Sequence, residues 1–139
     1  MAKIERHISR ELVSLDASTP CREAARLMAE KKIGAVGVNR GRKTIGLVTE
    51  RDLVVKLLAL GLSCEVPIAE VMRHDLPSIG PDATELECSD LMREHYTRHL
   101  LVEKSSEVVG IISMRDVIRL MLDEKQFLID QLEVYISGR

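Results

Sequence analysis

Two short segments of the sequence pair a hydroxyl side chain with a carboxylate three residues later. Thr49 precedes Asp52, Ser113 precedes Asp116, and a glycine and two apolar residues come directly before each hydroxyl. If a strand delivers the hydroxyl to the start of a helix, the unpaired backbone N–H groups there can hold a phosphate. The carboxylate then offers two acceptor oxygens that suit the vicinal hydroxyls of a ribose. Together these groups meet the requirements of a nucleotide site.

The same spacing also has a purely structural interpretation. A hydroxyl followed three residues later by a carboxylate is an ordinary arrangement for capping the start of a helix. Either segment alone is better explained as a cap. Because the pattern occurs twice, each time after a glycine and two apolar residues, we favour the nucleotide interpretation.

These segments belong to an internal repeat with a separation of 64 residues, measured from Gly46 to Gly110. Without any gap, the stretch 12–59 matches the stretch 76–123. Self-similarity on this scale indicates a supersecondary unit that cannot bury its apolar face alone, so the two copies are expected to pack together. The sequence predicts one α+β body built from two halves.

Each copy is predicted to contain a strand, a helix, two strands and a second helix, in that order. Thr19 is expected to cap the first helix, with Pro20 at its first helical position. Residues 61–67 are a short connection, followed by a short helix at 68–72. A long C-terminal helix is expected to carry an exposed apolar stripe that seeks a partner surface. The predicted elements are strands 12–15, 35–38 and 44–48 with helix 19–32 and a turn at 39–42, then strands 76–79, 99–103 and 108–112 with helix 83–96 and a turn at 104–106, and helices that start after Thr49 and Ser113, the last reaching Ile136.

Composition limits the classes of function. The chain has 139 residues, of which 45% are hydrophobic and only 2% aromatic, and its net charge is −2. A single aliphatic core is expected at this length. Few aromatic side chains are available to stack bases, and no general positive field would attract nucleic acid or an anionic membrane. No apolar stretch resembles a signal peptide or a membrane span, so a soluble, cytoplasmic protein is expected.

Metal binding and cysteine chemistry are not expected. Cys21, Cys64 and Cys88 are an odd set with long spacings, which fits neither a zinc motif nor a disulfide framework. His95 and His99 have the spacing of two ligands on a helix, but the helix is predicted to end before His99 and no third ligand is evident. We therefore predict free thiols, no metal and no catalytic residue.

Several features together resemble the cystathionine β-synthase (CBS) domain family. They are the two hydroxyl–carboxylate segments, called the signatures from here on, the segment around Met72 and the run from Arg98 through Val102. Paired repeats of this family are called Bateman modules, and the closing run 131–136 is similar to the tail of small stand-alone bacterial members. The resemblance implies tandem repeats packed with pseudo-two-fold symmetry, repeat 1 in residues 1–66 and repeat 2 in residues 67–139. It also implies a homodimer, and a regulatory sensor rather than an enzyme.

The resemblance further implies an adenosyl ligand, such as AMP, ADP, ATP, NAD(H) or S-adenosylmethionine, held in clefts between the repeats. By motif position, the ligand-binding residues would be Asp52 and Asp116 at ribose, Thr49 and Ser113 at phosphate, Arg98 and His99 also at phosphate, and the segments around Ser14 and Ser78 at adenine. Arg51 and Arg115 either add phosphate contacts or lie in solvent.

The first copy departs from this pattern. Gly34 and Ala35 occupy the positions of Arg98 and His99 and supply no charge, so the two clefts are expected to be unequal. Leu101 stands where the family often has proline, a change expected to affect strand geometry. Two other functions stay open: a protein interaction or oligomerisation module that binds no ligand, and a small enzyme that acts through Cys64 or a histidine–aspartate pair. For the sensor, the protein target is unidentified.

Overall fold

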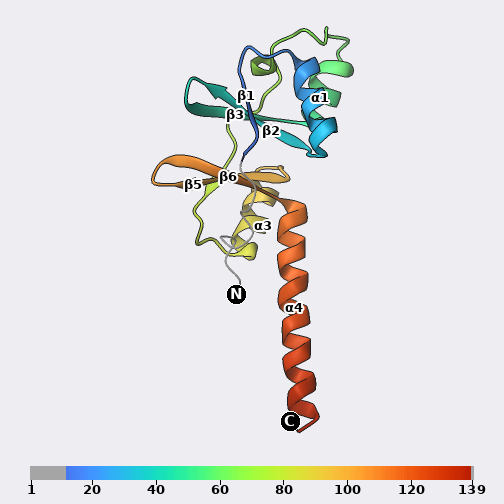
Figure 1. The fold of residues 1–139 in the computed structure, drawn as a ribbon, viewed down its shortest axis with the longest axis vertical. Coiled ribbons are helices and arrows are strands. Elements are labelled where there is room, and N and C mark those ends of the chain that lie inside the picture. The colour runs from blue at the N-terminus through green and yellow to red at the C-terminus, as the bar shows by residue number, and fades with distance from the viewer. Residues whose placement is uncertain (1–11, 139) are drawn as a thin grey trace. The chain divides into compact units, whose positions relative to one another are not determined.

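The computed structural model describes residues 12–138 (Figure 1). The chain divides into two compact units, one spanning Leu12–Leu76 and the other containing residues 77–138. Each unit contains one copy of the repeat. The predicted division between residues 66 and 67 separates the copies by sequence, whereas the first compact unit extends to Leu76.

The first unit is a three-stranded sheet covered by short helices. Strand β2 (Ala35–Arg40) lies in the middle, parallel to β1 (Ser14–Asp16) and antiparallel to β3 (Lys43–Thr49). Its helical segments are α1 (Cys21–Lys31), α2 (Glu50–Leu53) with a π-helical continuation η2 (Val54–Leu58), and a 3-10 turn η3 (Ile68–Glu70). An aliphatic core joins them, formed by residues that include Val36, Val48, Ala24, Met28, Leu57 and Ile68.

The second unit repeats this plan. Strand β5 (His99–Lys104) is parallel to β4 (Ser78–Ile79) and antiparallel to β6 (Glu107–Ser113). Helices α3 (Glu85–Glu94) and α4 (Met114–Ile136) follow β4 and β6. Among residues 77–138, the core again consists of aliphatic residues, methionine and cysteine, including Cys88, Met92, Leu100, Ile112 and Leu120. The predicted α+β class and the long C-terminal helix are confirmed.

The duplication extends to backbone detail. Lys32 and Tyr96, separated by the repeat distance, both adopt the left-handed conformation just after the first helix of their copy, with φ of 55° and 51°. The N–H of Gly37 donates to the carbonyl of Val13 at 2.8 Å, and Leu101 donates to Pro77 in the same way at 3.3 Å. Proline at position 101 could not donate that bond, so leucine there completes the pairing of β4 with β5.

Several predicted boundaries were wrong, and a contact distant in sequence sets one of them. Pro20, not Thr19, is the N-cap of α1, in an extended conformation, and the N–H of Cys21 donates to the carbonyl of Val66 at 2.9 Å. Helix α3 is shorter than the predicted span 83–96, since Thr84 caps it and it ends at Glu94, two residues before left-handed Tyr96. Both hairpin turns have only two residues, 41–42 and 105–106.

The connection after η2 packs on the first unit. Ile68 is fully buried, and its N–H donates to the carbonyl of Thr19 at 2.8 Å. Leu47 and Arg73 exchange two backbone hydrogen bonds, of 2.9 and 2.8 Å, which add a one-residue bridge to the outer edge of β3. This segment is therefore fixed to the first sheet rather than acting as a flexible linker.

Helix α4 extends far beyond its packing partner α3 (Figure 1). Only Val117 and Leu120 are buried in it, and every residue from Lys125 to Ile136 is exposed. None of the helices in residues 12–138 has both the length and the apolar character that crossing a bilayer requires.

Candidate functional site

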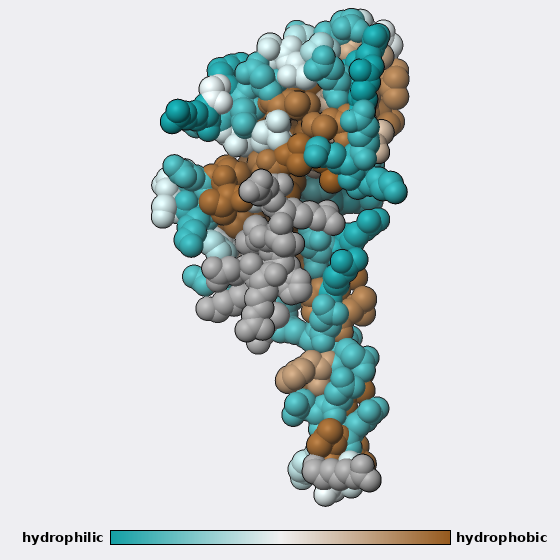
Figure 2. Space-filling view, viewed as in Figure 1, coloured by the Kyte–Doolittle hydropathy of each residue, from teal (hydrophilic) through white to brown (hydrophobic). Residues whose placement is uncertain are grey.

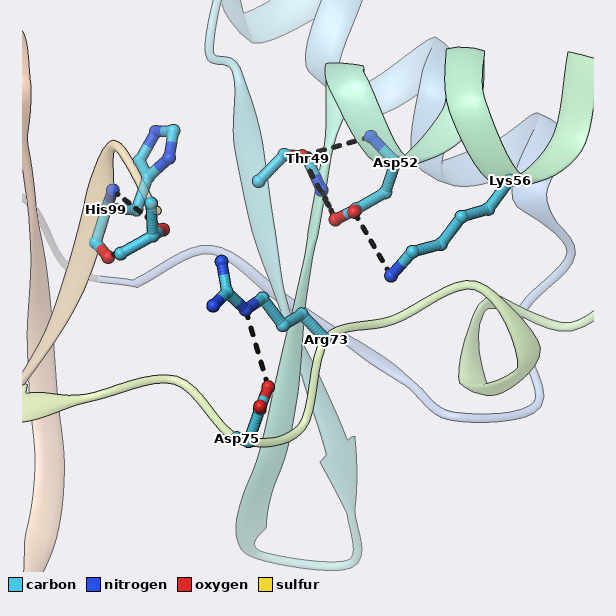
Figure 3. Close-up of polar contacts among 7 residues, drawn as sticks. Thr49, Asp52, Lys56, Arg73, Asp75 and His99 are labelled. Carbon is cyan, nitrogen blue, oxygen red and sulfur yellow. Dashed lines mark hydrogen bonds and ion pairs between the residues drawn. The ribbon is translucent and has the colours of Figure 1, made fainter. Parts of the chain in front are cut away.

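Each hydroxyl–carboxylate signature folds as a reciprocal cap at the start of a helix. The N–H of Thr49 donates to Oδ2 of Asp52 at 2.9 Å, and the N–H of Asp52 donates back to the Thr49 hydroxyl at 3.1 Å (Figure 3). Ser113 and Asp116 make the same two bonds at 2.9 and 3.2 Å. The predicted N-cap roles of Thr49 and Ser113 are confirmed.

These caps use most of the groups that were expected to hold a phosphate. The Thr49 hydroxyl donates to Oδ2 of Asp52 at 3.0 Å, and the Ser113 hydroxyl donates to Oδ2 of Asp116 at 2.8 Å. The first helical N–H is also occupied in both copies, by the carbonyl of residue 34 at 3.0 Å and that of residue 98 at 2.8 Å. At each helix start, the hydroxyl and the first helical N–H are therefore already hydrogen-bonded and are not free to bind a phosphate. A phosphate contact by either hydroxyl, which stays a prediction, would require the hydroxyl to change its partner.

The second carboxylate oxygen distinguishes the two copies. In the first copy, Nζ of Lys56 lies 3.4 Å from Oδ1 of Asp52, whose side chain is only 14% exposed (Figure 3). At the repeat distance from Lys56 the second copy has Leu120, which is buried in the core. Among the described residues, Oδ1 of Asp116 has no ion-pair partner. Asp116 thus keeps an acceptor oxygen that Asp52 shares with a lysine.

In the second copy, a histidine on β5 lies beside the signature residue on the neighbouring strand β6. His99 is the direct partner of Ser113 in the β5–β6 pairing, and directly paired residues project their side chains from the same face, about 5 Å apart. The His99 backbone is fixed by Thr97, whose hydroxyl accepts the His99 N–H at 3.2 Å and donates to the His99 carbonyl at 3.1 Å. Arg98, directly before His99, is exposed.

The corresponding place in the first copy carries no charge. Ala35 is the direct partner of Thr49, and Gly34 comes before it. The first copy therefore has a carboxylate that is already paired and no cation equivalent to Arg98. The second copy gathers Arg98, His99, Ser113 and Asp116 at one end of its sheet.

The serines predicted at adenine lie elsewhere in each sheet. Ser14 is paired with Gly37 on β1, and β1 and β3 form opposite edges of the sheet, so Ser14 is about 10 Å from the strand that carries Thr49. Its hydroxyl donates to the carbonyl of Leu12 at 3.4 Å. Ser78, on edge strand β4, is exposed and pairs with Leu101. Within one copy, the fold does not bring these serines beside the signature.

The two arginines within the signatures, Arg51 and Arg115, are exposed. Their part in phosphate binding stays a prediction. The sequence reasoning missed Lys56, although its spacing of four residues from Asp52 on a predicted helix was the signal that could have found it.

The cysteines and the described histidines occupy separate places in the fold. Cys21 and Cys88 are buried at the predicted helix positions, and burial raises the pKa of both thiols, that of Cys88 to about 11. His95 caps the end of α3, whereas His99 lies on β5. Within residues 12–138, no group of three or more histidine, cysteine or acidic side chains could hold a metal ion.

A groove of about 310 Å³ lies beside α1 and α2 in the first unit. Its lining is mostly apolar, which suits aliphatic side chains better than a phosphate or a sugar. The residues that line it are Cys21, Arg22, Ala25, Met28, Ala29, Glu50, Leu53, Val54, Leu57, Leu58 and Cys64.

Comparison with known protein families identifies the family to which the two repeats belong. The sequence profile of the CBS domain matches residues 4–59 and again residues 68–123. The chain belongs to the CBS-domain family. The resemblance inferred from the signatures is confirmed.

Relatives of similar size agree with this assignment. The chain is 27% identical over 117 residues to the CBS domain-containing protein YhcV of Bacillus subtilis, and the match covers 84% of each protein. It is 29% identical to a putative signal-transduction protein with CBS domains from Burkholderia ambifaria, with a TM-score of 0.84 and coverage of 88% of this chain and 95% of that one. The fold also matches the CBS domain protein PAE2072 from Pyrobaculum aerophilum, solved in complex with AMP, at 24% identity, a TM-score of 0.75 and coverage of 83% and 89%.

Proposed function

We propose that this CBS pair is a regulatory module that binds an adenosyl ligand, and that Asp116 contacts the ribose hydroxyls. The observation that carries the proposal is the difference between the two capped carboxylates. Oδ2 of Asp116 is held by the Ser113 N–H and hydroxyl, while its Oδ1 has no ion-pair partner among the described residues. A carboxylate oxygen held in place by a cap can accept a diol hydrogen bond without further ordering of its side chain.

Cationic and polar neighbours would complete the ligand contacts in the second copy. Arg98 and His99 supply the donors suited to phosphate, and Ser113 and Arg115 lie close enough in sequence to join them. Ser14 and Ser78 are retained as candidates for adenine. The first copy is the weaker candidate, because Lys56 competes for Asp52 and residues 34–35 carry no charge.

The ligand class is AMP, ADP, ATP, NAD(H) or S-adenosylmethionine. The AMP complex of PAE2072 supports this class at the level of the fold alone. We propose a cytoplasmic sensor that acts as a homodimer on a protein target, in which the ligand favours one of two conformations of the module and shifts their populations. Catalysis by Cys21 or Cys88 is disfavoured because burial raises the pKa of both thiols.

Titration calorimetry with AMP, ADP, ATP, NAD, NADH and S-adenosylmethionine tests the proposal. Asp116→Asn is the informative variant and Asp52→Asn its matched control, since the side-chain oxygen of an asparagine at the third helical position can still accept the N–H of the N-cap residue. Asp116→Asn should weaken binding about tenfold or more, because hydrogen bonds to a charged acceptor contribute about 1.5–3 kcal/mol. Asp52→Asn should change it much less. Urea unfolding of both variants checks that the caps survive.

The alternative function is an interaction module that binds no adenosyl ligand. It is favoured by one observation, that both signatures serve as helix caps and hold their hydroxyls in those caps. No heat from any of the six ligands with ligand-free, folded protein would support this alternative. Equal losses in the two variants would contradict the assignment to the second copy.

A further inference from the structure

Helix α4 carries an apolar stripe that no described residue covers. Ile118, Leu122, Ile129, Leu132 and Ile136 are each between 47% and 81% exposed. Their spacing alternates between four and three residues once Lys125 is included, which is the repeat of a coiled-coil seam. The seam is about 27 Å long. Apolar side chains are visible along this part of α4 in Figure 2.

The outer part of α4 requires a partner to be stable. All residues from Lys125 to Ile136 are exposed, so tertiary packing supports only the start of the helix. Helical segments of roughly 12 residues are marginal in water without an apolar face packed against something. An exposed seam of this kind marks an interaction surface.

Charges beside the seam identify the partner. Taking Ile118 as position d and Leu122 as position a, Arg119, Gln126 and Glu133 occupy successive e positions. Within residues 12–138, neither the Arg119 nor the Glu133 side chain has an ion-pair partner. In an antiparallel pair of helices, the e positions of one helix lie beside the e positions of the other. Residues that face each other lie on opposite sides of a common midpoint in the sequence. With the midpoint near residue 127, Arg119 of one chain faces Glu133 of another identical chain.

The apolar layers agree with the same midpoint. Ile118 then packs against Ile136 of the second copy, and Leu122 against Leu132. Lys125 packs against Ile129, so the two lysines lie in different layers. In a parallel pair, each d residue faces its own equivalent, which would place two Lys125 ammonium groups against each other in the seam. The antiparallel arrangement avoids that repulsion and forms two Arg119–Glu133 pairs.

We propose that two copies of this chain associate through an antiparallel pairing of their α4 helices, centred near residue 127. The occupant of the seam is a second copy of α4, fixed in direction by Arg119, Glu133 and Lys125. This proposal does not rest on ligand binding, so its success or failure leaves the adenosyl assignment to its own test.

Charge reversal tests the pairing. Arg119→Glu places two like-charged pairs in the dimer and should weaken association through α4 about tenfold, as should Glu133→Arg. The double variant R119E/E133R restores opposite charges and should return to within about threefold of the wild type. Sedimentation equilibrium of the full chain measures the association constants. Single variants indistinguishable from the wild type would overturn the proposal.

Cross-linking tests the direction. In a Cys64→Ser background, where the exposed native thiol is absent, Ile118→Cys and Ile136→Cys chains are mixed and treated with a short bis-thiol reagent. The mixture should give a cross-linked dimer, whereas neither variant alone should. Self-cross-linking of Ile136→Cys would indicate a parallel pair and overturn the proposal. A monomer whose α4 amides resist hydrogen exchange would overturn it too, because another segment would then cover the seam.

Discussion

Gly46, the glycine of the first signature, is predicted to be indispensable for packing rather than for ligand contact. A Cβ atom added there would lie 2.7 Å from the carbonyl oxygen of Arg73 and 2.8 Å from Sδ of Met72. Both distances are well inside van der Waals contact. The methionine sulfur can move by a rotamer change, but the backbone oxygen belongs to the bridge between Leu47 and Arg73.

The cost of Gly46→Ala follows from that bridge. To relieve the clash, residues 72–73 must move away from β3, which stretches two backbone hydrogen bonds of 2.9 and 2.8 Å. Each bond contributes about 1 kcal/mol net. Forcing an extra methyl group into a packed site adds about 1–3 kcal/mol. If both bonds are lost, we expect the free energy of unfolding to fall by about 3–5 kcal/mol.

Urea unfolding monitored by circular dichroism measures this loss, with the slope of the transition checked for constancy. Gly34→Ala is the matched control in the same unit, because a Cβ there meets nothing closer than 3.7 Å. The control should stay within about 0.5 kcal/mol of the wild type. A Gly46→Ala protein that loses less than about 1 kcal/mol would refute the reasoning, since the bridge would then be free to shift at little cost.

Three further predictions concern the second unit and the thiols. The hydrogen bond with Glu124, aided by burial, raises the pKa of Glu85, so the folded state binds that proton more tightly than the unfolded chain does. The stability that protonated Glu85 contributes is complete at low pH and is lost as pH rises through the raised pKa. The Glu85→Gln variant should show no such loss when its free energy of unfolding in urea is measured across that pH range. A thiol reagent should label exposed Cys64 quickly in the native protein and Cys88, with its pKa near 11, only after unfolding. Ser113→Ala removes a helix cap and should cost about 1 kcal/mol in the same unfolding assay, whereas Ser113→Asp should retain most of the stability.

The architecture was predictable because the same sequence pattern occurs in both copies of the repeat. The repeat distance, the apolar periodicity and the two hydroxyl caps each indicated the same order of elements in both copies, and the structure confirms that order. Helix ends were less predictable, because they depend on contacts distant in sequence and on the conformation of single residues. The sequence around Pro20 does not indicate that the carbonyl of Val66 accepts the N–H of Cys21. The positive φ of Tyr96 is unusual for an aromatic residue.

The two helix caps were predictable from the sequence, whereas the hydrogen-bonding state of their polar groups was not. Spacing alone placed Thr49 beside Asp52 and Ser113 beside Asp116 at helix starts. It could not reveal that each hydroxyl gives its hydrogen to the neighbouring carboxylate, because a rotamer and a hydrogen-bond direction depend on the folded geometry. Nor does it place Ser14 on the opposite edge of the sheet from Thr49, which follows from the strand order.

Capping and ligand binding are therefore compatible uses of one carboxylate. Oδ2 is committed to the helix start in both copies, and that commitment fixes the direction in which Oδ1 points. Whether Oδ1 is available depends on the residue one helical turn later, a lysine at position 56 and a leucine at position 120. The signature that defines the repeat thus makes the same hydrogen bonds in the two copies, and the functional difference that we propose between them arises from a position outside it. In a duplicated module, such positions are where two equivalent scaffolds can acquire unequal sites.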